Sequence, residues 1–320
     1  MRFTPEDTVA TDAGRPLISV VMPAWKRPEK VQRAVQSVMQ QEFSHWELII
    51  VDDASPEPME APLREAGVLD DPRVRLLRHS INGGGSAARN TGIQHATAPW
   101  VALLDADDLW LPGKLTSDAD FARLHEGERC FGFGQFWVDT GTARRTSVPA
   151  QREQVEQLDE FMFVDRGAMQ TSSLLVPTWL ARECPFDPTL RRLQDWDFVL
   201  RLWRSGAIPI PIACRQTIYD APDDAARISS NLDPEFLLRW LHQRRDWFTP
   251  RARAGYLANK VAPELVQTGQ RARAASLLAR GAAAGVVAPR SLAIELLRLC
   301  VPASAFRGAV QLKHRIRRRG

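Results

Sequence analysis

Residues 17–55 read LISVVMPAWKRPEKVQRAVQSVMQQEFSHWELIIVDDAS, and this stretch decides the fold. Residues 17–22 form an apolar, β-branched run that stops at a proline, which predicts a buried strand. From Pro28 to Gln41 the apolar residues recur at helical spacing, so a helix should follow. Residues 47–51 form a second apolar run that ends in two aspartates. A strand, a helix and a strand in this order are typical of a parallel sheet covered by helices.

The same alternation continues downstream. A third strand is expected at residues 73–77, a helix at residues 86–96 with Ser86 as its N-cap, and a fourth strand at residues 100–104. The predicted fold is therefore α/β, with a mostly parallel, Rossmann-like sheet flanked by helices. Ligands bind such sheets at the carboxyl ends of the strands.

Polar residues gather at these predicted strand ends. They are residues 23–27, Asp52, Asp53, Asp105, Asp107 and Asp108. Like charges held close together are costly without a cation, and Mg²⁺ or Mn²⁺ prefers one or two carboxylates together with phosphate oxygens. Asp105 and Asp107 suit a metal bound to a diphosphate. The alternative is turn chemistry, with Asp108 capping the segment that follows it.

The glycine-rich motifs of other parallel-sheet proteins are missing. There is no G-x-G-x-x-G after the first strand, which argues against a dehydrogenase, and no G-x-x-x-x-G-K-[ST], which excludes a P-loop. Residues 82–86, NGGGS, open the helix before the fourth strand instead. They either let backbone approach a ligand or form a plain loop and cap.

The middle and the end of the chain continue in a different pattern. Residues 130–137 are expected to form a strand, with a hairpin turn at residues 141–142. Residues 169–176 change from polar to apolar, as in a strand that begins at the rim of a site. From Asp233 onward the pattern is helical, with an alanine-rich helix pair broken at residues 268–269.

The composition is that of a folded soluble protein, with 44% hydrophobic and 25% charged residues in 320. The four cysteines form no C-x-x-C pair and no dense disulfide framework. The first 16 residues lack the basic and apolar regions of a signal peptide, and no run approaches the roughly 18 apolar residues of a membrane span. We expect a cytoplasmic protein, with any contact to the inner face of the membrane peripheral.

The charge is unevenly distributed. Residues 1–249 contain 28 Lys and Arg against 36 Asp and Glu, whereas residues 250–320 contain 14 against 2. The basic end is either a solvated tail or a surface for an anionic partner. Phospholipid is favoured over nucleic acid, because no aromatic stacking residues are interleaved with the charges.

Five motifs together resemble one family. They are SVVMPAWKRPE at residues 19–29, SVMQQ at 37–41, WELIIVDDAS at 46–55, NGGGSAARNTGI at 82–93 and LLDADDLWLPGKL at 103–115. In order and spacing they are similar to the N-terminal half of family 2 glycosyltransferases with a GT-A fold. The resemblance implies an inverting transfer from a nucleotide-sugar, usually a UDP-sugar, assisted by Mn²⁺ or Mg²⁺.

The resemblance also implies roles for individual residues. Asp53 would hydrogen-bond the uracil, Trp25 would stack near the base, and Asp107 would hold the metal. The other expected nucleotide-sugar contacts are Pro23, Ala24, Arg27, Gly85, Arg89, Asn90, Asp105 and Ala106. Ala24-Trp25-Lys26 stands where the family commonly has Thr-Tyr-Asn.

Residues 191–202, RRLQDWDFVLRL, resemble the family's G-E-D-x-D-x-x-L-R-L element. By that resemblance Asp195 is the catalytic base, at a helix N-terminus, and Asp197 is the next candidate. Gln194 replaces the usual glutamate. The simpler interpretation is an amphipathic helix with Asp195 as its N-cap.

Four segments are predicted. They are a flexible start (1–16), a nucleotide-sugar-binding half (17–115), an acceptor-side half (116–225) and a helical region with a basic tail (226–320). The expected function is sugar transfer to a hydroxyl of a surface glycan, a lipid-linked saccharide or a similar acceptor. The alternatives are a degenerate nucleotide-binding scaffold and a sugar nucleotidyltransferase, although the latter should have a basic, glycine-rich loop after the first strand.

Overall fold

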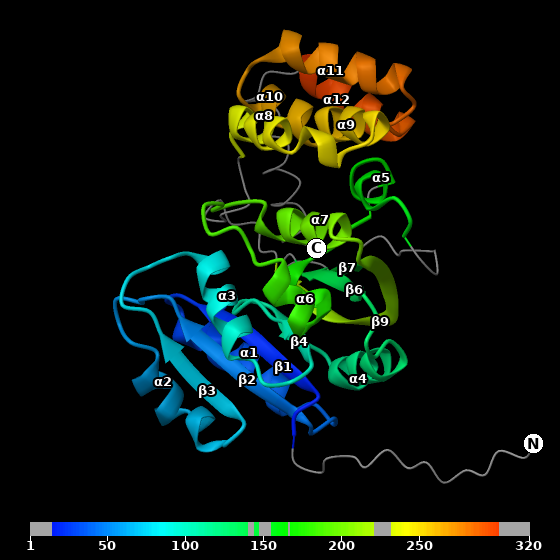
Figure 1. Cartoon of the computed structure of the whole chain (residues 1–320). Coiled ribbons are helices and arrows are strands. Elements are labelled where there is room, and N and C mark those ends of the chain that lie inside the picture. The colour runs from blue at the N-terminus through cyan, green and yellow to red at the C-terminus, as the bar shows by residue number, and fades with distance from the viewer. Residues whose placement is uncertain (1–14, 140–143, 147–154, 166, 221–231, 301–320) are drawn as a thin grey trace, which may run out of the picture.

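The computed structural model describes residues 15–139, 144–146, 155–165, 167–220 and 232–300. Among these residues one sheet has the strand order β3-β2-β1-β4-β8-β6-β9-β5, and β7 pairs with β6 (Figure 1). The predicted turn at residues 141–142, the flexible start and the basic tail from residue 301 lie outside the described residues.

The N-terminal half of the sheet is parallel throughout. Its strands are β1 (Ile18–Ala24), β2 (Trp46–Asp52), β3 (Val74–Arg78) and β4 (Trp100–Leu103). β1 lies between β2 and β4, and β2 pairs with β3 on its other side. All four carboxyl ends therefore lie at one edge of the sheet.

The second half of the sheet is mixed. Its strands are β5 (Leu109–Trp110), β6 (Cys130–Asp139), β7 (Arg144–Thr146), β8 (Leu174–Pro177) and β9 (Ile208–Asp220). β8 runs antiparallel to both β4 and β6, while β6 and β9 are parallel. The predicted α/β fold is confirmed, with its antiparallel pairs confined to this half.

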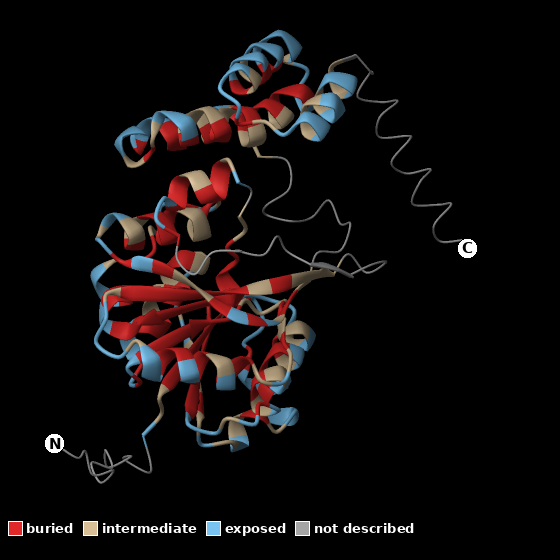
Figure 2. Cartoon of the chain, turned by 90° about the vertical axis from the view of Figure 1, so that its right-hand side faces the viewer, coloured by how far each residue is buried: buried red, intermediate tan, exposed pale blue. Residues whose placement is uncertain are grey.

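Helices cover both faces of the sheet because strand residues alternate between two apolar cores. Ile18, Val20 and Met22 belong to one core, and Val21 to the other. Residues of α1 (Pro28–Met39), α2 (Glu60–Glu65) and α4 (Lys114–Leu124) join the first core, and residues of α3 (Gly85–His95), α6 (Thr178–Glu183) and α7 (Gln194–Arg204) join the second. Figure 2 shows the strands buried between these layers.

The last described residues, 232–300, form a group of helices on the α7 side. They are α8 (Pro234–Gln243), α9 (Pro250–Tyr256), α10 (Ala262–Gln267), α11 (Arg271–Ala283) and α12 (Pro289–Cys300), and α5 (Leu158–Phe163) packs against α9. Residues Leu257–Val261 form a π-helical turn that joins α9 to α10. Three 3₁₀ turns complete the described elements, at Val68–Asp70, Thr171–Ser173 and Arg245–Trp247.

Five aromatic side chains join this group to α7. The ring of Phe163 lies 5.3 Å from that of Trp196 and 5.1 Å from that of Tyr256. Trp240 and Phe248 complete the cluster, at 5.5 Å and 6.1 Å from Tyr256. Phe163, Trp240 and Tyr256 are almost fully buried. The C-terminal helices thus share the core of the sheet domain.

One local prediction is wrong. Gly84, not Ser86, occupies the N-cap position of α3. Gly84 has φ +86°, a left-handed value that favours glycine. The N-cap therefore lies two residues earlier than expected, and the helix begins at Gly85. Ser86 is instead buried in the first turn. Among the described residues, no helix is both long enough and apolar enough to cross a membrane.

Candidate functional site

The ends of β1, β2 and β4 meet as the sequence predicts. The amide of Asp53 donates to the carbonyl of Ala24 over 2.8 Å, which ties the end of β2 to β1. The amide of Leu104 donates to the carbonyl of Val21 over 3.0 Å, which ties β4 to β1 on the other side. Asp53 and Asp105 therefore lie on either side of the segment that leaves β1.

Asp52 has a structural role. Its carboxylate is fully buried and accepts hydrogen bonds from the amides of Ser55 (2.9 Å) and Met59 (3.3 Å). Arg78 forms an ion pair with the same carboxylate and also donates to the carbonyl of Ser55 over 2.8 Å. These contacts fix the turn that follows β2, and with it the neighbouring Asp53.

Asp53 holds the glycine-rich loop. Its carboxylate accepts from the amides of Gly83 (2.8 Å) and Gly84 (2.6 Å), and it lies 2.8 Å from Nδ1 of His79. The other ring nitrogen of His79 lies 2.8 Å from the Thr91 hydroxyl. Hydrogen bonds to an ionised carboxylate are strong, so Asp53 fixes where the loop lies. A direct contact with a nucleotide base stays a prediction.

The loop also approaches the segment before α7. A side chain at Gly84 would place a Cβ 2.4 Å from a guanidinium nitrogen of Arg191, which itself lies 3.4 Å from the Asn82 side-chain oxygen. Arg191 was not singled out from the sequence, because it lies 107 positions beyond the loop. It brings a positive charge to the glycine backbone.

Arg89 is the centre of the site. From α3 it forms an ion pair with Asp105, at the end of β4, and donates to the side-chain oxygen of Gln194 over 2.9 Å. Gln194 in turn donates to the carbonyl of Leu190 over 2.8 Å. Only 7% of Arg89 is exposed, so its pairing with Asp105 is shielded from water. Three segments that are far apart in sequence meet here.

Asp108 fixes the acidic turn. It is fully buried, accepts 2.6 Å and 3.0 Å hydrogen bonds from the Ser172 hydroxyl and the Asp220 amide, and also accepts from the Gln170 side chain. The Ser172 hydroxyl also accepts from the Asp105 amide over 2.9 Å. Burial, together with the charges of Asp105 and Asp107, raises the pKa of Asp108 well above the usual range. Asp108 is therefore an anchor of the turn and no helix cap.

Asp195 lies in the first turn of α7, directly after Gln194. Leu193 occupies the N-cap position and its side chain makes no capping hydrogen bond, so the interpretation of Asp195 as the N-cap is wrong. The Asp195 carboxylate accepts from the Trp196 amide over 2.9 Å. Burial raises its pKa; the negative charge of Asp105 adds to the rise and Arg89 opposes it. A raised pKa suits a carboxylate that takes up a proton.

Asp197 has different surroundings. Its fully buried carboxylate lies 2.7 Å from Nε of Arg201, accepts from the Trp240 indole over 3.3 Å, and forms an ion pair with Arg244. Arg201 lies one turn further along α7, Trp240 lies on α8, and Arg244 directly follows α8. These contacts tie α7 to the C-terminal helices and make Asp197 unsuited to act as a base.

Strained backbone gathers around the same edge of the sheet. The described non-glycine residues with left-handed φ are Lys26, Arg27, Ala54 and Leu193, at +53° to +60°. The first three follow β1 and β2, and Leu193 precedes Asp195 by two positions. Such conformations cost on the order of 1 kcal/mol each and concentrate at functional sites. Their placement is an independent indication that this edge is the site.

The remaining predicted contacts vary in position. Trp25 is 49% exposed, with the Lys26 ammonium 4.1 Å from its ring centre, and Arg27 is exposed beside it. The half-buried Pro23, the buried Ala24 and the half-buried Gly85 and Ala106 line the ends of their elements. Asn90 differs, because its side-chain amide both donates to and accepts from the Phe186 backbone, at 2.8 and 2.9 Å. A contact between Asn90 and a donor would require it to give up these bonds.

The donor set fits a hard divalent cation. Arg89 engages Asp105, three hydrogen bonds engage Asp108, and the half-buried Asp107 lies in the same turn after β4. One carboxylate together with diphosphate oxygens is a usual ligand set for Mg²⁺ or Mn²⁺. Elsewhere in the described part, His125, Glu128 and Cys130 come within ligand distance of one another, at the opposite edge of the sheet. Burial raises the pKa of Cys130 to about 12, so its thiol stays protonated.

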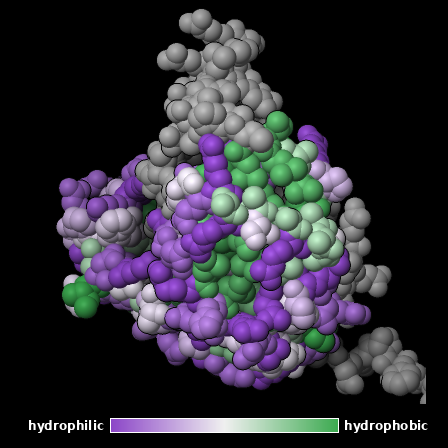
Figure 3. Space-filling view, turned by 90° about the horizontal axis from the view of Figure 1, so that it is seen from above, coloured by the Kyte–Doolittle hydropathy of each residue, from purple (hydrophilic) through white to green (hydrophobic). Residues whose placement is uncertain are grey.

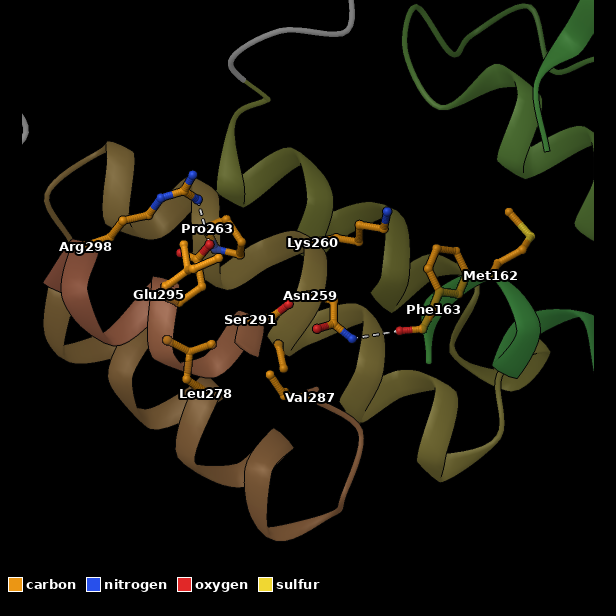
Figure 4. Close-up of a pocket in the computed structure, with 12 residues that line it drawn as sticks. Met162, Phe163, Asn259, Lys260, Pro263, Leu278, Val287, Ser291, Glu295 and Arg298 are labelled. Atoms are coloured by element: carbon orange, nitrogen blue, oxygen red, sulfur yellow. Dashed lines mark hydrogen bonds and ion pairs between the residues drawn. The ribbon is translucent and has the colours of Figure 1, made fainter. Parts of the chain in front are cut away.

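A cavity of about 410 Å³ lies between α5 and the C-terminal helices (Figure 4). Lys260, Ser291, Glu295 and Arg298 line it together with apolar side chains. Asn259 closes one side by donating to the carbonyls of Phe163 (2.9 Å) and of Val286 (3.0 Å). The Lys260 ammonium lies 4.9 Å from the ring centre of Trp196, next to Asp195.

A twisted sheet with acidic strand ends, a glycine-rich loop and a carboxylate at the start of α7 defines an α/β protein of the GT-A type. Residues 19–133 match the model of glycosyl transferase family 2, which confirms the predicted resemblance over this part of the chain.

This chain is also similar to two relatives and to one solved structure. The chain is 30% identical over 190 residues to WcaA of Escherichia coli K12, assigned to colanic acid biosynthesis as a glycosyl transferase, with 58% of this chain and 66% of that protein covered. It is 32% identical over 122 residues to the Escherichia coli UDP-Glc:alpha-D-GlcNAc-diphosphoundecaprenol beta-1,3-glucosyltransferase WfgD, with 38% and 46% covered. The chain thus spans two thirds or less of either relative.

The structure of TarS residues 1–349 from S. aureus in complex with UDP-GlcNAc is similar with a TM-score of 0.57 at 16% identity. The likeness covers 82% of this chain and 72% of that one. At this identity the likeness concerns the fold, and it extends well beyond residues 19–133 into the second half of the chain.

Proposed function

We propose that this protein is a glycosyltransferase that moves a sugar from a nucleoside diphosphate sugar to a hydroxyl group in surface polysaccharide synthesis. The observation on which the proposal depends most is the contact of Arg89 with both Asp105 and Gln194. It joins the acidic end of β4 to the start of α7, and so brings the donor side of the site to the candidate base Asp195.

UDP is the nucleotide that the comparisons favour. WfgD is named for a UDP-Glc donor, and the TarS structure contains UDP-GlcNAc. In this chain Trp25 offers an exposed ring for a base, while Asp53 and Arg191 place a carboxylate and a cation at the glycine loop. The diphosphate would lie between the loop backbone and the end of β4. Asp107 would hold Mn²⁺ or Mg²⁺, and a bound cation would supply positive charge to the diphosphate.

We propose the following steps for the transfer of the sugar. The acceptor oxygen attacks the anomeric carbon from the face opposite the diphosphate, and the bond between that carbon and the phosphate oxygen breaks. The diphosphate leaves with the electron pair, and the acceptor proton moves to the carboxylate of Asp195. The configuration of the sugar is inverted. Arg89 keeps Asp105 in place through the step, because the guanidinium contacts both Asp105 and the residue before the base.

The acceptor is proposed to be a lipid-linked saccharide. WfgD is named for a diphosphoundecaprenol-linked GlcNAc acceptor. The cavity beside Trp196 offers apolar walls together with Lys260 and the ion pair between Glu295 and Arg298, which suits an amphiphilic molecule. A nucleotidyltransferase is disfavoured because the segment after β1, Ala24-Trp25-Lys26, contains no glycine.

Calorimetric titration tests the donor site without any acceptor. UDP, GDP and dTDP are titrated with and without Mn²⁺ into the wild type, Asp107→Ala and the control Asp120→Ala, whose carboxylate is exposed on α4. We expect UDP to bind in the presence of Mn²⁺, to bind at least about tenfold more weakly to Asp107→Ala, and to bind Asp120→Ala as it binds the wild type. Folded protein that binds no nucleotide would overturn the proposal in favour of a scaffold.

A further inference from the structure

Helix α12 presents an apolar side to solvent. Ile294, Leu296 and Leu297 are 42%, 48% and 64% exposed. Ile294 also lines the cavity, together with the polar residues Ser291, Glu295 and Arg298 (Figure 4). Leu292 and Leu299 pack against the core, so α12 has apolar side chains both inward and outward. A surface helix of a soluble protein normally keeps its apolar residues inward and turns its charges outward.

This exposure is concentrated. Eight large hydrophobic side chains of the described residues are exposed, and five of them stand far from one another in the sequence. The other three fall within the four residues 294–297. Single exposed apolar residues need no explanation, whereas a cluster marks a surface that another molecule covers. Seen from above, towards the C-terminal helices, Figure 3 shows hydrophobic side chains gathered beside hydrophilic ones.

The charge of this region indicates what covers the helix. Residues 250–320 contain 14 Lys and Arg against 2 Asp and Glu, and exposed arginines stand on α11 and α12 themselves, at Arg280 and Arg290. A second copy of the same region would bring like charges together. An anionic lipid surface would instead attract them, by roughly 1 kcal/mol for each basic residue near the surface.

The length of α12 sets how it could meet a bilayer. Twelve residues make a helix of about 18 Å, which is too short to cross a hydrocarbon core of about 30 Å. A helix of this length with leucines on one side and basic residues around it lies in the plane of the membrane interface.

We propose that α12 docks this protein on anionic membranes, with Leu296 and Leu297 entering the interface and the surrounding basic residues contacting the lipid headgroups. The docking does not depend on the proposed sugar transfer. It would hold the cavity between α5 and α12 next to the bilayer.

Flotation with lipid vesicles tests the proposal on the full chain. Vesicles of phosphatidylglycerol and phosphatidylcholine in equal parts are compared with vesicles of phosphatidylcholine alone, at low and high salt. The variants are Leu296→Ser/Leu297→Ser, the control Leu124→Ser, which changes a 75% exposed leucine on α4, and Arg317→Ser/Arg318→Ser/Arg319→Ser. Thermal unfolding of each variant shows whether it is folded, and the leucine variants should be, because Leu124, Leu296 and Leu297 are exposed.

The wild type should bind the anionic vesicles, bind the neutral ones at least about tenfold more weakly, and lose affinity in high salt. The double leucine variant should bind about thirtyfold more weakly, since each leucine would bury about half of its side chain in the interface. Leu124→Ser should bind as the wild type does. The proposal is overturned if the wild type does not bind anionic vesicles, or if only the arginine variant loses binding. It is also overturned if sedimentation shows a dimer that the leucine changes dissociate.

Discussion

Asp195 and Asp197 stand two residues apart in α7, yet we propose opposite roles for them, and changing each to asparagine should separate these roles. Asp197→Asn should lower stability, whereas Asp195→Asn should lower only the rate of transfer. Both variants keep the size and shape of the side chain, so each removes a charge and little else.

The cost at Asp197 follows from its contacts. Its side chain is 1% exposed and faces the side chains of Arg244 (8% exposed) and Arg201 (32% exposed). Removing one partner of a buried ion pair typically costs 3 to 5 kcal/mol. Asp187 still lies 3.3 to 3.4 Å from both arginines and would offset part of the loss. We therefore expect the free energy of unfolding to fall by about 3 kcal/mol, or about a hundredfold in the ratio of folded to unfolded protein.

The cost at Asp195 should appear in catalysis. Burial already disfavours its charged form, so the loss of that charge should change the free energy of unfolding by less than about 1 kcal/mol. Loss of a general base lowers rates by typically 10²- to 10⁴-fold. The nucleotide should bind Asp195→Asn within a fewfold of its wild-type affinity, because the proposed role of Asp195 is to take the acceptor proton and not to hold the nucleotide.

Three measurements on each variant decide between the roles. Urea unfolding followed by tryptophan fluorescence gives stability, calorimetry gives UDP affinity, and release of UDP from a UDP-sugar in the presence of an acceptor gives the rate. The reasoning is refuted if Asp195→Asn retains the wild-type rate, or if Asp197→Asn is as stable as the wild type.

Three further predictions concern pH, packing and thiol chemistry. The pKa of Asp195 is raised and a base must be deprotonated, so kcat/KM should fall with decreasing pH at a midpoint above the usual carboxyl pKa of 3.8. If the residual rate of Asp195→Asn falls at the same midpoint, another group is responsible and the prediction is contradicted. Gly255→Ala should lower the unfolding free energy by about 1 to 3 kcal/mol, since a Cβ there would lie 2.6 Å from the carbonyl oxygen of Phe163, and urea unfolding measures the change. Burial raises the pKa of Cys130 to about 12 and that of Cys214 to about 11, so both should resist alkylation at pH 8 in the native protein and react in urea, as mass spectrometry would show.

Local patterns were enough to predict the sheet's first half. β1, β2 and β4 are short runs in which almost every residue is buried, and α1 follows β1 with its apolar residues at helical spacing. The strand ends could therefore be placed, and the parallel order followed from the alternation. Helix starts were harder, because the left-handed backbone at Gly84 and Leu193 leaves little trace in the residue types around it.

Contacts between distant residues could not be predicted. Ser172 contacts Asp105 and Asp108 from more than 60 positions away, and its segment was equally compatible with an ordinary turn. Asp197 was a second candidate base until the fold showed Arg244, 47 positions later, against its carboxylate. Such pairings depend on how α7, α8 and the sheet come together, which residue patterns do not contain.

The π turn at Leu257–Val261 has a consequence for comparing this chain with its relatives. It contains one residue more than a regular helical path between α9 and α10. Because the wider turn absorbs this extra residue, deleting Asn259 would let α9 and α10 join as one regular helix with the flanking residues still on their original faces. Tyr256 and Leu265, both fully buried, would then still face the same core. A relative without the π turn should therefore show a one-residue gap here, with its apolar residues at the same positions on both helices.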